Sequence, residues 1–418
     1  MVNTILLKQI LKNNKFIYSM YLKYKSFMYR NNFKIDSIRV PNPIEDTNEK
    51  LRVNLVLVDL QKTGVFGGSL TAQTIIKELA DLYNSDSRII LIGNDKYNKK
   101  LTYNIEGYKH NYPNKGLYYL SENNNIDVRK NDLFIFTFWT TAYSFINILE
   151  WQKKQYNIYN RKAVYLIQDY EPGFYQWSTE YVLAESTYNK NCESLIAIFN
   201  SEELSNYFKI NGYTFAHELY FKPCINDKLK EILLTTKPDT KRLKRILIYG
   251  RPGVARNAFE IIQKALMLWS KKYFKASEWE IISLGEKIST IQLERNRIVS
   301  CGKVSLEEYA NYMLTAYVGI SLMISPHPSY PPLEMSTFGV KTITNTFLSK
   351  DLTQFNENII SLKSYTPDDI CNCLISICSS YENNNSLVIT EGEYIVGDSF
   401  HNMIISLGNI LNEMLAGE

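Results

Sequence analysis

One stretch of the sequence, residues 302–345, constrains the fold more than any other. A helical pattern over Leu306–Tyr317 leads into an apolar run over Val318–Ile324, and a proline-rich loop follows. A short helix then begins near Pro332 and ends at a glycine, before a further strand over Lys341–Thr344. This order predicts a β-loop-α-β unit of the kind that holds a nucleotide at the carboxyl end of a parallel sheet.

The loop and the short helix of this unit offer a place for a phosphate. A helix amino terminus presents free N–H groups and the positive end of its dipole. Glu334 lies in the first turn of the expected helix, where its carboxylate could accept hydrogen bonds from two ribose hydroxyls. We therefore expect this unit to bind a nucleotide.

The residues around this helix resemble a known family. L-E-M-S-T-F-G-V-K-T-I-T-N (333–345) is similar to the nucleotide-sugar segment of glycosyltransferase family 4, whose usual form is E-A-M-A-C-G followed by P-V-V-A-T. Three further stretches resemble the WsaF-type rhamnosyltransferases within that family. They are I-Q-D-Y-E-P-G-F-Y (167–175), T-E-Y-V-L-A-E-S-T (179–187) and S-P-H-P-S-Y-P-P-L-E-M (325–335). The resemblance covers about residues 50–395.

The chain is long enough for two domains. With 418 residues it exceeds what one core usually organises. Apolar runs alternate with helical patterns, which is typical of parallel doubly wound sheets. Besides the unit above, we expect strands at 53–59, 88–92, 133–138, 163–168, 195–199, 245–249, 279–284 and 298–301. We expect helices at 68–83 and 398–415, and others beginning near 201 and 257.

The predicted fold class is α/β, and the resemblance implies the GT-B architecture, in which two Rossmann-like domains face a central cleft. The expected divisions are a basic amphipathic helical segment (1–48), an acceptor-side Rossmann-like domain (49–235), a nucleotide-sugar-binding Rossmann-like domain (244–395) and a carboxyl-terminal helix (396–418). The polar stretch 231–244 is interpreted as the hinge, and 40–49, with its two prolines, as a linker.

Residues 1–48 interleave bulky apolar and aromatic residues with basic ones. The basic residues are Lys8, Lys12, Lys15, Lys23, Lys25, Arg30, Lys34 and Arg39. This pattern fits a helix lying on an anionic membrane surface, although packing on the first domain or binding a partner fits it equally well. The sequence has no apolar run long enough to span a bilayer and no signal peptide. We therefore expect a cytoplasmic protein that could lie on the inner face of the plasma membrane.

Charge and cysteine content exclude some other classes. A net charge of +4 is too small to argue for nucleic-acid binding. Cys371, Cys373 and Cys378 are close in sequence, but Cys371 and Cys378 share one helix face with Leu374 and Ile375. We interpret them as buried helix thiols rather than a zinc site, and expect no metal and no cofactor other than the nucleotide sugar.

The diphosphate of a sugar nucleotide gains negative charge as it leaves, so fixed cations should face it. Arg251 and Arg256 follow a predicted strand; they match the family pattern, with Arg256 in place of its usual lysine. Lys303 is a weaker donor-binding candidate. Gly67 and Gly68 form the first strand-to-helix loop, which faces the donor in the family. Solvated arginines and an ordinary tight turn are the alternative interpretations.

The segment Gln168–Tyr175 directly follows a strand and combines carboxylates with aromatic rings. We expect it to bind the acceptor through Asp169, Tyr170, Glu171, Phe174 and Tyr175. Asp169, ahead of Glu171, is the candidate group to orient or deprotonate the acceptor hydroxyl. Together with Arg251 these carboxylates are the candidate catalytic groups. A turn with solvated acids is the alternative.

One position departs from the wider family. The family carries a second glutamate seven residues before the one matching Glu334, and Pro326 occupies that position here. The resemblance places that glutamate near the transferred sugar, so its loss fits a deoxysugar such as L-rhamnose carried on dTDP. His327 could replace the contact or serve the loop structurally, and Tyr330 is a further donor-binding candidate.

The resemblance implies a retaining glycosyltransferase that builds a cell-surface polysaccharide or lipid-linked oligosaccharide, with a nucleotide-sugar donor and a saccharide acceptor as partners. Same-face attack, in which the leaving phosphate helps to take the acceptor proton, is the implied mechanism. Two alternatives remain open. The same fold could use a UDP- or GDP-hexose, or the chain could be a non-catalytic sugar- or nucleotide-binding subunit.

Overall fold

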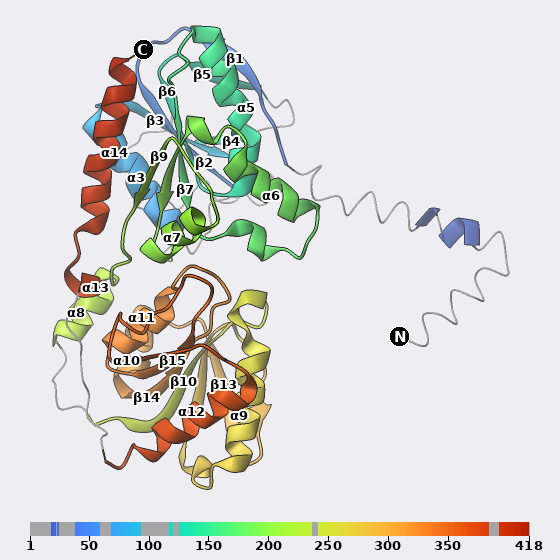
Figure 1. Ribbon diagram of the computed structural model, residues 1–418, viewed down its shortest axis with the longest axis vertical. Helices are drawn as coiled ribbons and strands as arrows, with labels where there is room; N and C mark the ends of the chain where they lie inside the picture. The colour runs from blue at the N-terminus through green and yellow to red at the C-terminus, as the bar shows by residue number, and fades with distance from the viewer. Residues whose placement is uncertain are drawn as a thin grey trace.

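The computed structural model describes residues 18–21, 23–24, 38–58, 68–92, 117–119, 125–235, 241–383 and 393–417. They form two α/β units that lie one above the other along the long axis of the molecule (Figure 1). Most of the predicted segment 1–48 lies outside the described residues, as do Gly67 and the middle of the predicted hinge.

The first unit is built on a seven-stranded parallel sheet. Its strands lie in the order β4-β3-β2-β6-β7-β8-β9, so β6 is the middle strand and β2, the first of them in sequence, lies beside it. The apolar runs of β2, β3, β6, β7 and β8 are buried on both faces, as expected for strands that helices cover on each side. The strands are β2 (Arg52–Leu57), β3 (Asp86–Leu91), β4 (Leu117–Tyr119), β6 (Asp132–Phe136), β7 (Ala163–Ile167), β8 (Leu195–Phe199) and β9 (His217–Tyr220).

Two groups of helices cover this sheet. The helices α5 (Trp139–Tyr156), α6 (Thr179–Asn189) and α7 (Glu202–Ile210) share one core with it. On the other face, α3 (Gly68–Leu82) packs beside α14 (Ser399–Ala416), as Figure 1 shows. The apolar side chains of α14 thus complete the core of a unit that lies far away in the sequence.

The second unit repeats this plan. Its seven-stranded sheet has the order β12-β13-β11-β10-β14-β15-β16 and is parallel except for β12. The strands that the sequence predicted here are all present, and β12 and β16 are additional. The strands are β10 (Leu243–Gly250), β11 (Glu280–Gly285), β12 (Ile291–Gln292), β13 (Arg297–Gly302), β14 (Ala316–Ile320), β15 (Lys341–Asn345) and β16 (Ile359–Leu362).

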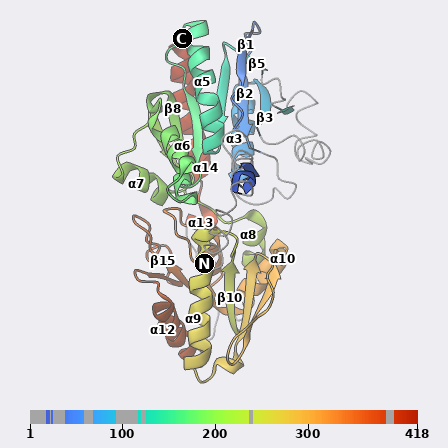
Figure 2. The ribbon, with the colours of Figure 1, turned by 90° about the vertical axis from the view of Figure 1, so that its right-hand side faces the viewer.

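The helices α9 (Phe259–Lys272) and α12 (Pro367–Ser379) lie side by side on one face of this sheet (Figure 2). Cys371 and Cys378 are buried in α12 against this core. The other face carries α8 (Asp227–Thr235), α10 (Leu306–Thr315), α11 (Tyr330–Thr337) and α13 (Glu393–Val396). In the described ranges, no helix combines the length and apolarity needed to cross a bilayer.

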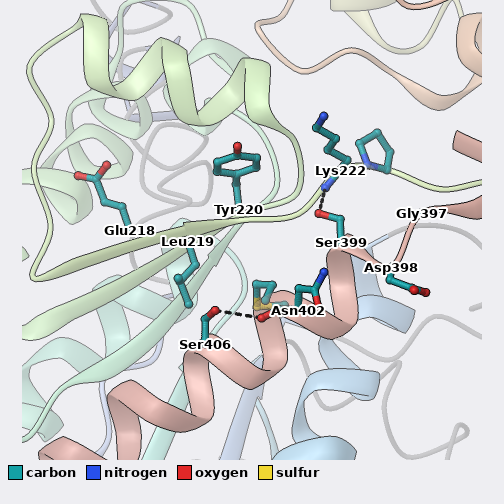
Figure 3. A pocket seen from close by; sticks show the side chains of 11 residues that line it. Glu218, Leu219, Tyr220, Lys222, Gly397, Asp398, Ser399, Asn402 and Ser406 are labelled. Atoms are coloured by element: carbon teal, nitrogen blue, oxygen red, sulfur yellow. Dashed lines mark hydrogen bonds between the residues drawn. The ribbon is translucent and has the colours of Figure 1, made fainter. Parts of the chain in front are cut away.

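The chain crosses between the units twice, and the two crossings are bonded to each other. The Ile225 amide donates to the Tyr394 carbonyl over 2.8 Å, and the Lys222 amide donates to Ser399 Oγ over 2.9 Å. A cavity of about 490 Å³ lies here between β9 and the start of α14, with Asn402 and Ser406 in its wall (Figure 3). None of the residues predicted to form the site lines it.

Two sequence-based predictions about connecting segments are wrong. Residues 42–46 are not a linker but the strand β1 (Asn42–Asp46), which pairs in parallel with β5 (Asn125–Arg129). A proline is tolerated there because β1 has a single neighbour, so its missing N–H breaks no ladder. The predicted hinge 231–244 begins within α8, whose Leu229 and Leu233 pack in the second core. The first crossing therefore lies earlier, near residues 221–226.

Candidate functional site

The two sheets present the carboxyl ends of their strands to each other, and Asp169 lies where they meet. It follows β7 and is buried, with 8% of its surface exposed. Its Oδ1 accepts hydrogen bonds from the Tyr170 amide, over 2.9 Å, and from the hydroxyl of Ser325 in the second unit. Its Oδ2 lies 3.4 Å from Nε of Arg256, also in the second unit. Asp169 thus connects both units.

Arg256 makes a second contact across the cleft. Its guanidinium carbon lies 3.8 Å from the centroid of the Phe174 ring, in the geometry of a cation–π interaction. Phe174 ends the 3-10 helix η2 (Glu171–Phe174), so the acceptor-side segment contacts the predicted phosphate-binding loop. Burial lowers the pKa of Arg256, while Asp169 opposes this shift.

Glu171 lies two residues after Asp169, but its carboxylate is bonded within the first unit. Its Oε2 accepts a hydrogen bond of 2.6 Å from the Trp139 amide, in the first turn of α5. Phe138 occupies the capping position of that helix and has no acceptor side chain, so Glu171 supplies one. Burial raises the pKa of Glu171 well above its ordinary value. This carboxyl is a helix cap in the structure.

The two tyrosines of the same segment also make contacts within the first unit. The Tyr170 ring packs in the first core, 5.0 Å from the Tyr207 ring. The Tyr175 hydroxyl accepts a hydrogen bond of 2.8 Å from the Trp139 indole nitrogen. Of the predicted acceptor-side residues, Asp169 and Phe174 contact the second unit, whereas Tyr170 and Tyr175 bond to side chains of their own unit.

The proline-rich loop 325–332 folds against Asp169. The His327 amide donates to Ser325 Oγ, and His327 Nδ1 accepts from the Ser329 amide, both over 3.0 Å. Ser329 has a φ of 69°, a left-handed conformation that costs energy for a residue with a Cβ atom. Burial lowers the pKa of His327 to about 4, so its imidazole is neutral at pH 7. Among the described residues, its buried Nε2 has no hydrogen-bond partner.

The helix α11 begins at Tyr330, two residues earlier than the sequence predicts. Glu334 therefore lies beyond its first turn, and the expectation that it occupies that turn is wrong. Burial raises the pKa of Glu334 to about 7, and the neighbouring Tyr309 hydroxyl opposes this shift. Tyr330 has a pKa raised to about 12 by burial, with Glu334 contributing. Glu334 thus acts electrostatically on the other candidate residue, Tyr330.

Two of the remaining predicted donor residues, Arg251 and Lys303, lie at the surface. Arg251 is exposed, and its amide donates to Asn257 Oδ1 over 2.6 Å, which fixes the loop between β10 and α9. No hydrogen bond or ion pair of its guanidinium occurs in the described part of the chain. Lys303 is exposed just after β13. Gly68 begins α3, while its neighbour Gly67 is outside the described residues.

Lys350 is a site residue that the sequence did not indicate. Its side chain is fully buried, and Nζ donates to the Met323 carbonyl over 2.6 Å. Burial lowers the pKa of Lys350 to about 7, and Asp169 and Glu203 oppose the shift. Its local sequence reads as a polar turn. The only sequence signal that could have indicated Lys350 was its position, five residues after β15 and therefore at the carboxyl end of the sheet.

The site thus combines one buried carboxylate with several cationic groups. Asp169 could accept a proton from a hydroxyl entering from the first unit, and Arg251 and Arg256 could stabilise an anion held by the second. Across the described ranges, no three His, Cys, Asp or Glu side chains cluster in a way that could hold a metal ion.

Two family models match this chain, one in each unit. The family model described as WsaF, N-terminal domain, matches residues 52–202, and that described as WsaF, C-terminal domain, matches residues 244–375. The O-antigen biosynthesis protein RfbC of Myxococcus xanthus is 29% identical over 223 residues, which make up 51% of this chain and 15% of that protein. The chain therefore corresponds to a small part of this relative.

Solved structures share the arrangement of the two units. Sucrose-phosphate synthase from Thermosynechococcus elongatus aligns with a TM-score of 0.50 and 12% identity, over 88% of this chain and 100% of that one. HepE of Anabaena, solved with UDP-glucose, aligns with a TM-score of 0.51 and 13% identity over the same shares. At such low sequence identities, the structural similarity shows that the chain shares the fold of these proteins.

Proposed function

Because the chain belongs to the WsaF family of GT-B glycosyltransferases, we propose that it transfers L-rhamnose from dTDP-L-rhamnose to a growing cell-surface polysaccharide or lipid-linked oligosaccharide. The observation that carries this proposal is the meeting of Asp169 with Arg256 and Ser325. A carboxylate on the acceptor side and a cation on the donor side lie within one contact distance. The groups that would hold the two substrates therefore come from opposite units and meet at one place, which is where the reacting atoms must be brought together.

In this proposal the second unit holds the donor. Arg251 and Arg256, with Lys303 beside them, stabilise the charge that grows on the diphosphate as the sugar leaves. Glu334 accepts hydrogen bonds from the ribose, while His327 and Tyr330 line the sugar. Gly67 and Gly68 approach the donor from the first unit. A neutral His327 with a free Nε2 suits a sugar hydroxyl better than it suits a phosphate.

The acceptor enters from the first unit, where Asp169 orients its hydroxyl. The bond between the anomeric carbon and the diphosphate oxygen breaks, the acceptor oxygen bonds to the same face of that carbon, and the hydroxyl proton passes to the departing diphosphate. The product retains its anomeric configuration. Pro326 supports a deoxysugar donor, because it leaves the transferred sugar without the carboxylate contact that the wider family offers.

Calorimetric titration with dTDP, UDP and GDP tests the donor nucleotide. We expect dTDP to bind most tightly, and dTDP-L-rhamnose to be consumed when a lipid-linked saccharide acceptor is present. Preferential binding of UDP or GDP would move the donor to a hexose nucleotide. Binding of a nucleotide without turnover of any donor on such acceptors would indicate a non-catalytic subunit.

We also propose that the protein works in the cytoplasm, on the inner face of the plasma membrane, where residues 1–48 attach it to anionic lipid. The eight basic residues of this segment support the idea, since each contributes about 1 kcal/mol near such a surface. Co-sedimentation with anionic liposomes, with and without residues 1–40, tests it, because this truncation removes all eight basic residues and leaves β1 in place. Loss of pelleting on truncation is expected, and equal behaviour of the two forms would refute it.

A further inference from the structure

The helix α6 carries the stretch 179–187, and its polar side chains gather around Tyr170. The Tyr170 hydroxyl donates to Glu185 Oε2 over 2.6 Å, and the Tyr213 hydroxyl donates to Oε1 of the same carboxylate. The Tyr181 hydroxyl lies 3.3 Å from that of Tyr170. Since Tyr170 and Tyr213 each give their single proton to Glu185, Tyr181 is the donor to Tyr170.

Only neutral donors stabilise the charge of Glu185. Besides the two tyrosines, the Asn189 amide lies 3.4 Å from Oε1. In the described part of the chain, no lysine or arginine pairs with this carboxylate. Each hydroxyl therefore matters for the arrangement, because a partly buried group that loses a partner costs more than an average hydrogen bond contributes.

Tyr170 is fixed by packing as well as by its hydroxyl. Its ring lies 5.0 Å from that of Tyr207, 5.9 Å from that of Phe208 and 6.3 Å from that of Tyr188, measured between centroids. Its backbone connects it to the cleft, because the Tyr170 amide donates to Asp169 Oδ1. The same oxygen accepts the Ser325 hydroxyl from the second unit.

We propose that Glu185 is a positioning residue, which holds Tyr170 by its hydroxyl and thereby fixes the 169–170 peptide and the direction of the Asp169 carboxylate. This inference rests on the proposed function, in which Asp169 orients the acceptor hydroxyl. It assigns the stretch 179–187 a task in the reaction through its contact with Tyr170. A displacement of about 1 Å at a reacting group can reduce the rate by roughly a hundredfold.

The test compares Glu185→Gln and Tyr213→Phe with the control Glu193→Gln, which changes an exposed glutamate just after α6. The first measurement is amide hydrogen exchange of the peptide covering residues 168–175, which needs no substrate. We expect exchange about tenfold faster or more in the two variants and unchanged in the control. Unchanged exchange in both variants would overturn the proposal, whatever the enzyme's activity.

The second measurement separates positioning from a general loss of stability. We expect kcat to fall roughly tenfold or more in Glu185→Gln, while the Kd for dTDP stays within about twofold of wild type. Added to Asp169→Asn, the Glu185→Gln change should have little further effect, because both act through one carboxylate. The positioning role would be refuted if the kcat losses of Glu185→Gln and Asp169→Asn were fully additive, or if dTDP binding were lost in parallel with kcat. A wild-type protein that turns over no donor would instead refute the proposed function, and hydrogen exchange would still decide the structural link.

Discussion

The Asp169 carboxylate lies 3.4 Å from the Nε atom of Arg256, although the two residues belong to different sheets. Arg256 also stacks on Phe174, so one side chain makes two contacts with the opposite unit. Closure of the cleft and the alignment of the candidate acceptor and donor groups therefore depend on the same residue.

Arg256→Ala should favour an open arrangement of the two units. The stacking contact alone is worth about 0.5–2 kcal/mol, depending on how far it is shielded from water. Arg256→Lys should recover only part of the effect, because an ammonium cannot stack as a flat guanidinium does. Small-angle X-ray scattering should show a larger radius of gyration for the alanine variant, with Lys264→Ala on the exposed side of α9 as the control. An unchanged radius would show that other contacts close the cleft.

Arg251→Ala should weaken dTDP binding without changing stability. Its guanidinium is exposed and can contact a phosphate. The loss of binding free energy for dTDP should therefore approach the roughly 1.5–3 kcal/mol typical of a charge-assisted contact. Titration calorimetry measures this directly. Arg297→Ala, at the amino end of β13, removes the same charge away from the cleft and should bind dTDP normally. Equal Kd values for both variants would remove Arg251 from the donor site.

Asp169→Asn and Glu171→Gln form a matched pair. The first should reduce kcat by roughly a hundredfold at nearly normal donor affinity, because the acceptor hydroxyl would lose the carboxylate that orients it towards the reacting carbon. The second should change kcat little, because burial already favours the neutral form of Glu171 and its carboxyl caps α5. Single-turnover transfer rates decide between them. A larger loss for Glu171→Gln would reverse the two assignments.

Donor binding should depend on pH through Glu334. Its pKa is raised from 4.5 to about 7, so the carboxylate becomes protonated, and a poorer acceptor for ribose hydroxyls, as the pH falls through 7. The same shift means that the folded protein binds more protons than the unfolded one between these values, so this group lowers stability as the pH rises towards 7. Glu334→Gln should flatten the dependence of the dTDP Kd between pH 6 and 8. A variant that retains the wild-type slope would exclude Glu334 as its source.

An ionic network at the other end of the first sheet should make the protein sensitive to acid. Arg129 bonds to Asp46 over 2.9 Å and to Asp86 over 2.7 Å. The pKa of Asp86 is lowered by its hydrogen bond from Lys50 and then by Arg129. Burial raises the pKa of Asp46, but the Asn48 amide and Arg129 together lower it below its ordinary value. The two carboxylates contribute fully to the free energy of unfolding above about pH 4. This contribution is lost as the pH falls through their lowered pKa values in the folded protein. Arg129→Leu should cost about 1 kcal/mol of unfolding free energy at pH 7, since the pairs are partly exposed, and much less at pH 3. Urea unfolding at both pH values measures the difference, and a constant cost would contradict the prediction.

The sequence predicted the central strands of both sheets because their apolar runs are buried on both faces. It missed β1, because Pro43 within the strand and Pro41 just before it are typical of a linker. It placed the hinge too late because most residues of α8 are polar. Asp169 and Arg256 were each recognised, but no local pattern could show that they touch, since tertiary packing brings together residues from two sheets. Lys350 was missed for the same reason, because its burial depends on how the loop after β15 folds back.

The helix α14 has a consequence for biosynthesis. Its Met403, Leu407 and Leu411 complete the core of the first unit, although about 180 residues separate it from β9. While the ribosome is still producing the second unit, the nascent first sheet lacks the helix that covers the apolar side chains beside α3 in the finished protein. The first half is therefore translated first and completed last, and nascent chains should attract chaperones until α14 emerges.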